Sequence, residues 1–512
     1  MGEKTLKQAT FDGMIWNYIT RFGNQIINII PAMILARLLT PDEYGVIAIS
    51  SVFVGFLTIF SESGFPMALV QKNNVTDTDI NSVFYFNILI SCILYLLLYF
   101  TSPIIAAFFN IEELTVIIRV ASFGIIITSF GSVQNTLFVK ELEYKKLSIA
   151  SLLSSLISCV VGIVLAYSGK SYWSLVFQSL SLLSCQSLIY WLLSRWRPSF
   201  LFSFKSLKNL FGYGSKVFLT QITNFGFNKV YDIVIGKMYK TSELSYFNKA
   251  ISTQNMVSDS FLGVLNNVAF PAFSKMQTDK ERLRTNVIRF LLMEFMITSF
   301  VMLLVIAMAK PIFHFLYSSR WDAAIPLFQI ICIWSIFKPV STILSNGLLS
   351  VGLSGICLRN GIISRVLNIA FLICTWKFGL AAMMAGQVLA YLIECALCFG
   401  SFNMEFKYSS FSFLKDVMPL TILSIFSCAC VYVSNLLLCK LVFIDNEFIY
   451  SLVQIIVSIP IGFVVFLMLH KKYKLFPFMD FSSIIIESTR KYTNLNRLIV
   501  KVFPERQCID HY

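Results

Sequence analysis

Apolar runs about as long as a membrane-spanning helix follow one another along almost the whole chain. Roughly 20 mostly apolar residues cross the hydrocarbon core of a bilayer, and Pro, Gly and charged clusters separate the runs here. The pattern predicts fourteen helices, at residues 11–38, 45–65, 82–108, 115–138, 147–168, 173–193, 212–237, 243–270, 286–309, 322–351, 358–376, 379–400, 417–438 and 448–469. The chain is therefore predicted to be an all-α, polytopic membrane protein.

The polar positions recur when the chain is compared with itself at a shift near 200 residues. The matches include Asn24 with Asn224 and Asn28 with Asn228 at a shift of 200, and Phe65 with Phe270 at a shift of 205. Ordered matches whose offset drifts slowly are typical of an old duplication. Six helices per repeat is an even number, so two parallel lobes with a cavity between them are expected. The predicted segments are an N-terminal lobe over 1–200, a C-terminal lobe over 201–410, two extra helices over 411–470 and a basic cytoplasmic tail over 471–512.

Composition agrees with a lipid environment, because 57% of the residues are hydrophobic and only 13% are charged. The formal net charge of +14 could indicate a nucleic-acid-binding protein. Most Lys and Arg residues lie instead in short loops, with an excess on one side, which is the positive-inside pattern. We therefore expect both termini in the cytoplasm and no nucleic-acid partner. The basic tail is expected to anchor the topology, and the alternative is that it rests on the anionic lipids of the inner leaflet.

Twelve cysteines and one acidic motif are the other possible sites of chemistry. The cysteines lie mostly within apolar runs, and the Cys395–Cys398 pair has no second pair or histidine nearby. Asp77-Thr78-Asp79 has the form of a nucleotide-sugar motif but stands alone in a short loop. The sequence predicts no metal, no cofactor and no catalytic residue.

Polar stripes mark two helices that the repeat aligns. The stripe positions are Asn17, Arg21, Asn24 and Asn28 in the first helix, and Gln221, Asn224, Asn228 and Asp232 in the seventh. Spacings of three and four place each set on one helical face. A charge near the bilayer centre costs at least about 2.5–3.5 kcal/mol, so it usually faces water or a partner. The alternative for the amides is packing through interhelical hydrogen bonds.

Deep cations and acids are the other candidates for the transport path. The cations are Lys229, Lys249, Lys338 and Arg365, and the acids are Glu62, Asp232, Asp259, Glu294 and Glu394. Cations inside a membrane protein favour an anionic substrate. The acids can couple transport to an ion, or they can simply pair with the cations. Lys229 and Asp232 are three residues apart and suit such a pair.

Two stretches carry a resemblance to a known family. Residues 36–45 read Ala-Arg-Leu-Leu-Thr-Pro-Asp-Glu-Tyr-Gly, and residues 63–72 read Ser-Gly-Phe-Pro-Met-Ala-Leu-Val-Gln-Lys. The chain resembles the Wzx-type polysaccharide flippases of the MOP exporter superfamily, a group also called lipopolysaccharide biosynthesis proteins. The resemblance implies alternating access that moves an undecaprenyl-pyrophosphate-linked oligosaccharide across a bacterial inner membrane. It also implies a lipid-tail groove at the last two helices.

Two other functions compete with this one. A multidrug exporter of the same superfamily would use buried acids to bind organic cations, which the deep Lys and Arg residues would repel. A membrane enzyme, such as a polysaccharide polymerase or ligase, typically carries a large periplasmic loop, and no predicted loop is that long. If the chain is a flippase, a polysaccharide polymerase is a candidate partner protein.

Overall fold

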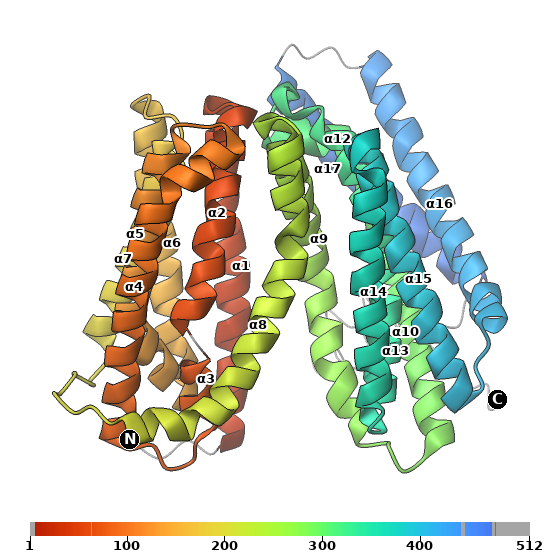
Figure 1. The fold of residues 1–512 in the computed structure, drawn as a ribbon. Coiled ribbons are helices and arrows are strands. Elements are labelled where there is room, and N and C mark those ends of the chain that lie inside the picture. Colours follow the sequence, from red (N-terminus) through yellow and green to blue (C-terminus); the bar gives the residue numbers. More distant parts are fainter. Residues whose placement is uncertain (1–5, 63, 442–445, 474–476, 478–512) are drawn as a thin grey trace. The chain divides into compact units, whose positions relative to one another are not determined.

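The computed structural model describes residues 6–62, 64–441, 446–473 and 477, with side chains except at 6–11, 14, 61, 62, 259–268 and 441. Every regular element in these ranges is a helix (Figure 1). The chain divides into two compact units, Met1–Asn248 and Lys249–Tyr512. The α-helices before the division are α1 (Leu6–Leu38), α2 (Pro41–Glu62), α3 (Phe65–Gln71), α4 (Asp77–Phe109), α5 (Leu114–Lys140), α6 (Tyr144–Tyr167), α7 (Trp173–Leu193) and α8 (Phe204–Met238).

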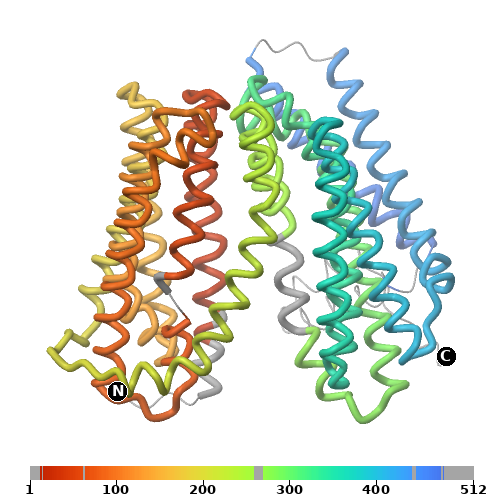
Figure 2. The backbone as a smooth tube through the Cα atoms, in the orientation of Figure 1, coloured from red at the N-terminus to blue at the C-terminus, as the bar shows by residue number. Residues whose placement is uncertain are grey.

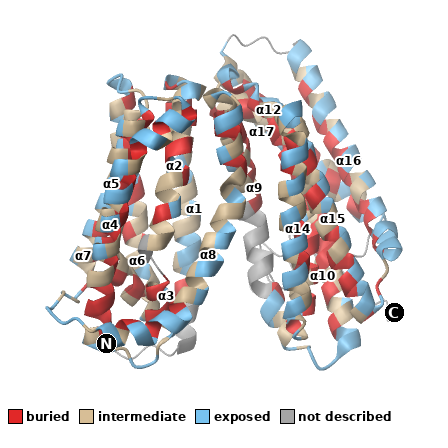
Figure 3. Cartoon of the chain, in the orientation of Figure 1, coloured by how far each residue is buried: buried red, intermediate tan, exposed pale blue. Residues whose placement is uncertain are grey.

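The second unit begins within α9 (Thr241–Ser274). Its other helices are α10 (Lys280–Ala307), α11 (Ala309–Leu316), η1 (Ser319–Trp321), α12 (Ala324–Ser335), α13 (Lys338–Ser350), α14 (Ser354–Thr375), η2 (Trp376–Phe378), α15 (Leu380–Phe406), α16 (Ser410–Leu441) and α17 (Glu447–Tyr473). α10 packs against α12, α13 and α16, and most of its middle residues are buried (Figure 3).

Eleven helices in the described part of the chain are long and apolar enough to cross a membrane. α1, α8 and α9 are not among them, although they have 33, 35 and 34 residues. Polar and charged positions interrupt their apolar surface, and these are the helices that carry most of the predicted transport residues. The protein is thus a multi-pass membrane protein, and a total of fourteen spans stays a prediction.

The helix predicted over 322–351 is in fact two helices, α12 and α13, separated at Ile336 and Phe337. Pro339 has no backbone N–H, so it begins a helix more readily than it continues one. The Cys395 thiol on α15 donates to the carbonyl of Phe337 at 3.3 Å, which provides a partner where the helix is broken.

α8 packs against α2, α3 and α4, and therefore belongs to the first unit. Its first turns run across one end of this unit before the helix rises past α2 (Figures 1 and 2). The repeat boundary expected at residue 200 and the boundary between the compact units at residue 248 therefore do not coincide.

Two glycines allow the backbones of this unit to approach closely at both ends of α2. A Cβ on Gly45 would lie 2.0 Å from the carbonyl oxygen of Thr241, and one on Gly64 would lie 2.1 Å from that of Gly214. Gly64 also has a φ of +70°, which favours glycine. The two stretches that carry the family resemblance contain these glycines, so part of their role is to permit backbone contact.

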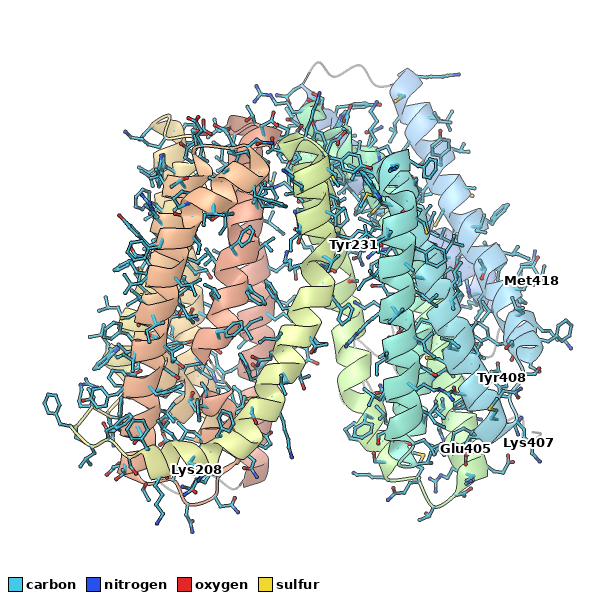
Figure 4. The ribbon with its side chains drawn as sticks, in the orientation of Figure 1. Lys208, Tyr231, Glu405, Lys407, Tyr408 and Met418 are labelled. Carbon is cyan, nitrogen blue, oxygen red and sulfur yellow. The ribbon has the colours of Figure 1, made fainter. Side chains whose placement is uncertain are left out.

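The turn from α15 to α16 shows how the second unit is held at a helix end (Figure 4). Lys407 has a φ of 52° and ends α15, while Glu405 accepts from Lys280 at 2.5 Å. Tyr408 donates to Asp416 at 3.0 Å. Burial, together with the Asp416 carboxylate, raises the pKa of Tyr408, so the phenol stays protonated and remains the donor.

We expect Gly45→Ala to destabilise the protein, because the new methyl group would overlap a backbone oxygen that no rotamer change can move. Overpacking of this kind typically costs about 1–3 kcal/mol. The measurement is the melting temperature of the purified full-length protein. Gly226→Ala is the matched control, since nothing lies within 4 Å of its Cβ position in α8. An unchanged melting temperature for Gly45→Ala would refute the close approach.

Candidate functional site

The residues of the polar stripe of α1 have different surroundings. The Asn24 amide donates to Ser151 at 2.7 Å and accepts from Ser155 at 2.9 Å, and both serines lie on α6. Asn24 therefore packs two helices together, as the alternative interpretation expected. Asn17 and Asn28 are exposed, and Arg21 is half-buried.

The stripe of α8 contains an internal ion pair. Lys229 donates to Asp232 at 2.6 Å, and the Asp232 side chain is only 4% exposed. The pairing that the spacing suggested is confirmed, and it accounts for both charges within one helix. Asn224 and Asn228 are exposed on the same helix.

Gln221 lines a cavity of about 480 Å³ inside the first unit. Side chains from α2, α3, α5, α7 and α8 surround it. The lining residues are Thr58, Pro66, Met67, Val70, Thr128, Ser129, Gly131, Ser132, Asn135, Thr136, Val139, Leu183, Gln186, Ser187, Tyr190 and Gln221. The cavity was not predicted from the sequence, although residues 128, 132 and 135 form a polar stripe with spacings of four and three.

Lys249, a predicted cation of the second unit, lies against two aromatic rings. Its ammonium nitrogen lies 4.5 Å from the centre of the Tyr317 ring and 4.9 Å from that of Trp321. Trp321 is fully buried, and the Tyr317 hydroxyl is 3.0 Å from that of Thr253, one turn along α9. Two aromatic faces thus stabilise a half-buried cation beside α11 and η1.

Lys338 and Arg365 lie on a different group of helices, α12 to α15. Lys338 is exposed at the start of α13, 5.9 Å from the Trp334 ring, which stacks on Tyr391 with centroids 4.3 Å apart. Arg365 is half-buried on α14. Its neighbour Ser364 donates to Glu394 on α15 at 2.6 Å.

The five acids have different surroundings. Asp232 is paired as described, Glu294 is 1% exposed within α10, and Glu394 is half-buried. The side chains of Glu62 and Asp259 lie outside the described residues.

Helices of membrane-spanning length, with cations and amides on several of them, define a multi-pass membrane protein with a transporter fold. The inward closed conformation of the lipid II flippase MurJ aligns with a TM-score of 0.68 and 17% identity, over 90% of this chain and 98% of that one. An inward-facing multidrug resistance MATE transporter of the MOP superfamily aligns with a TM-score of 0.61 and 17% identity, over 76% of this chain and 98% of that one.

The chain belongs to the polysaccharide biosynthesis protein family, whose profile matches residues 34–326. The teichuronic acid biosynthesis protein TuaB of Bacillus subtilis is 22% identical over 409 residues, which are 77% of this chain and 85% of that protein. The family indicated by the two sequence stretches is therefore confirmed.

We expect Lys229→Met to destabilise the protein, because it leaves the buried Asp232 carboxylate without its cation. An uncompensated buried group costs roughly 1–3 kcal/mol. Replacing both partners, as Lys229→Met with Asp232→Leu, should restore most of the melting temperature. If the single variant melts like the wild type, the pair does not contribute to stability.

Proposed function

We propose that this protein is a flippase that moves an undecaprenyl-pyrophosphate-linked oligosaccharide from the cytoplasmic to the periplasmic leaflet of a bacterial inner membrane. It works by alternating access, with both termini in the cytoplasm, in the biosynthesis of a surface polysaccharide. The observation that supports this proposal best is the position of Lys249, a cation of α9 that lies against two aromatic rings in a member of the polysaccharide biosynthesis protein family.

The chemistry of Lys249 suits a pyrophosphate. Electrostatic attraction is stronger where water is sparse, so a fixed ammonium can replace part of the hydration that the anion loses on leaving water. The Tyr317 and Trp321 rings lie against the ammonium, and their negative π faces stabilise its positive charge. Lys338 and Arg365, and Arg21 of α1, are the further cations that we assign to the substrate path.

The rival function is multidrug export, and the fold does not decide between the two because MATE transporters share it. An organic cation would be repelled by Lys249, Lys338 and Arg365. Glu294 and Glu394 are the described acids that could serve either a drug or a coupling ion. In the flippase we assign them to ion coupling, with membrane lipids around α16 and α17 receiving the lipid tail.

We expect Lys249→Ala, Lys338→Ala and Arg365→Ala each to reduce surface polysaccharide in a strain that lacks the wild-type gene. The loss should exceed tenfold for Lys249, which lies against two aromatic rings, and lipid-linked precursor should accumulate inside the cell. The measurements are surface polysaccharide and membrane-extracted precursor, at matched protein levels.

Lys377→Ala is the matched control, since this exposed lysine lies 5.3 Å from the Trp376 ring in η2. It should leave polysaccharide unchanged. Normal export by all three variants would contradict the proposed role of the cations. Drug resistance conferred by the wild-type chain would favour the multidrug alternative.

A further inference from the structure

The cavity in the first unit has a lining that is polar but uncharged. Ten of its sixteen lining residues are Ser, Thr, Asn, Gln or Tyr, and none is Lys, Arg, His, Asp or Glu. Its volume of about 480 Å³ lies within the roughly 300–1,000 Å³ of ordinary ligand pockets. The lining therefore differs in kind from the surroundings of Lys249.

Two amides of the cavity have hydrogen-bonding capacity to spare. Asn135 on α5 and Gln221 on α8 make no hydrogen bond to any residue that the structure describes. Each amide offers two N–H donors and one carbonyl acceptor. Both side chains are half-buried in the cavity lining, so their spare donors and acceptors are open to water or a ligand.

The hydroxyls of the cavity complement the amides. Thr128 donates to the carbonyl of Ile125 at 2.9 Å, and Thr136 donates to that of Ser132 at 2.8 Å. Each hydroxyl hydrogen is thereby used within α5, so the oxygen remains as an acceptor. Such a site can receive the O–H groups of a ligand while the amides bind the ligand's oxygens.

We propose that this cavity binds uncharged sugar residues of the lipid-linked oligosaccharide, an inference that rests on the proposed flippase function. A sugar ring has hydroxyls that both donate and accept, and C–H faces that are apolar. The amides and hydroxyls match the first property, and Pro66, Met67 and Leu183 match the second. An acyl chain in the same cavity would leave Asn135 and Gln221 unpaired.

Two probes and two variants test this in the full-length protein in lipid nanodiscs, because glycoside detergents would compete for the site. One probe is the oligosaccharide released by mild acid from lipid-linked precursor of the organism's own membranes, and the other is inorganic pyrophosphate. Binding is followed by saturation-transfer NMR for the sugar and by calorimetry for pyrophosphate. The variants are Asn135→Leu with Gln221→Leu, and Lys249→Ala, with Gln71→Leu as an exposed amide control.

In the cavity double variant, oligosaccharide binding should be at least tenfold weaker and pyrophosphate binding unchanged. In Lys249→Ala, pyrophosphate binding should be at least tenfold weaker and oligosaccharide binding unchanged. Unchanged oligosaccharide binding in the double variant, or none in the wild type, would overturn the cavity assignment. Oligosaccharide binding without any pyrophosphate binding in the wild type would overturn the proposed cationic site instead. If the double variant fails to fold, the single variants Thr128→Val and Thr136→Val take its place. Each is expected to bind the oligosaccharide at least threefold more weakly than the wild type, and unchanged binding by both would overturn the cavity assignment.

Discussion

A polar side chain in a membrane helix must find its partner inside the protein, because the surrounding lipid offers none. The two units meet this constraint in several ways. Asn24 is satisfied by serines of α6, and Lys229 by Asp232 one turn away. Lys249 lies against two aromatic faces, which stabilise its charge but do not cancel it. Amides, carboxylates and aromatic rings thus all serve as partners for polar side chains in these helices.

A second constraint, the absence of a Cβ at two glycines, sets how close the backbones can come. Glycines at both ends of α2 allow carbonyl oxygens of Gly214 and Thr241 to approach where any side chain would collide. Thr40 and Glu43 cap the start of α2, and Asp42 accepts from the Thr241 hydroxyl at 2.6 Å. Residues 36–45, one of the two stretches that carry the family resemblance, thus serve mainly to begin α2 and to permit backbone contact. They say little about the cargo.

Apolar runs sufficed to predict where the long helices lie, because lipid imposes a minimum length on each one, but the short helices α3 and α11 were not predicted. The runs could not predict the break between α12 and α13, which depends on Pro339 and on the Cys395 thiol of another helix. Helical spacing predicted the side of α1 on which Asn24 lies, but not which helix contacts that side. The contact with α6 follows only from the tertiary structure. The cavity could not be predicted from the sequence for a related reason. Ser and Thr are common in membrane helices, and only the tertiary structure shows which of them gather around one space.

The proposed cargo has a charged part and an uncharged part, and the protein has a cationic position at Lys249 and an uncharged cavity in the first unit. A pyrophosphate is common to many lipid-linked precursors, whereas the sugars differ between them. Cations such as Lys249 would bind the common part, and their long-range attraction is insensitive to sugar identity. An uncharged cavity acts through directional hydrogen bonds, which discriminate between sugar stereoisomers because a misplaced hydroxyl leaves a polar group unpaired. Selectivity for the sugar is therefore expected to reside in the α5 and α8 lining of the cavity in the first unit, and affinity for the anion in the cations.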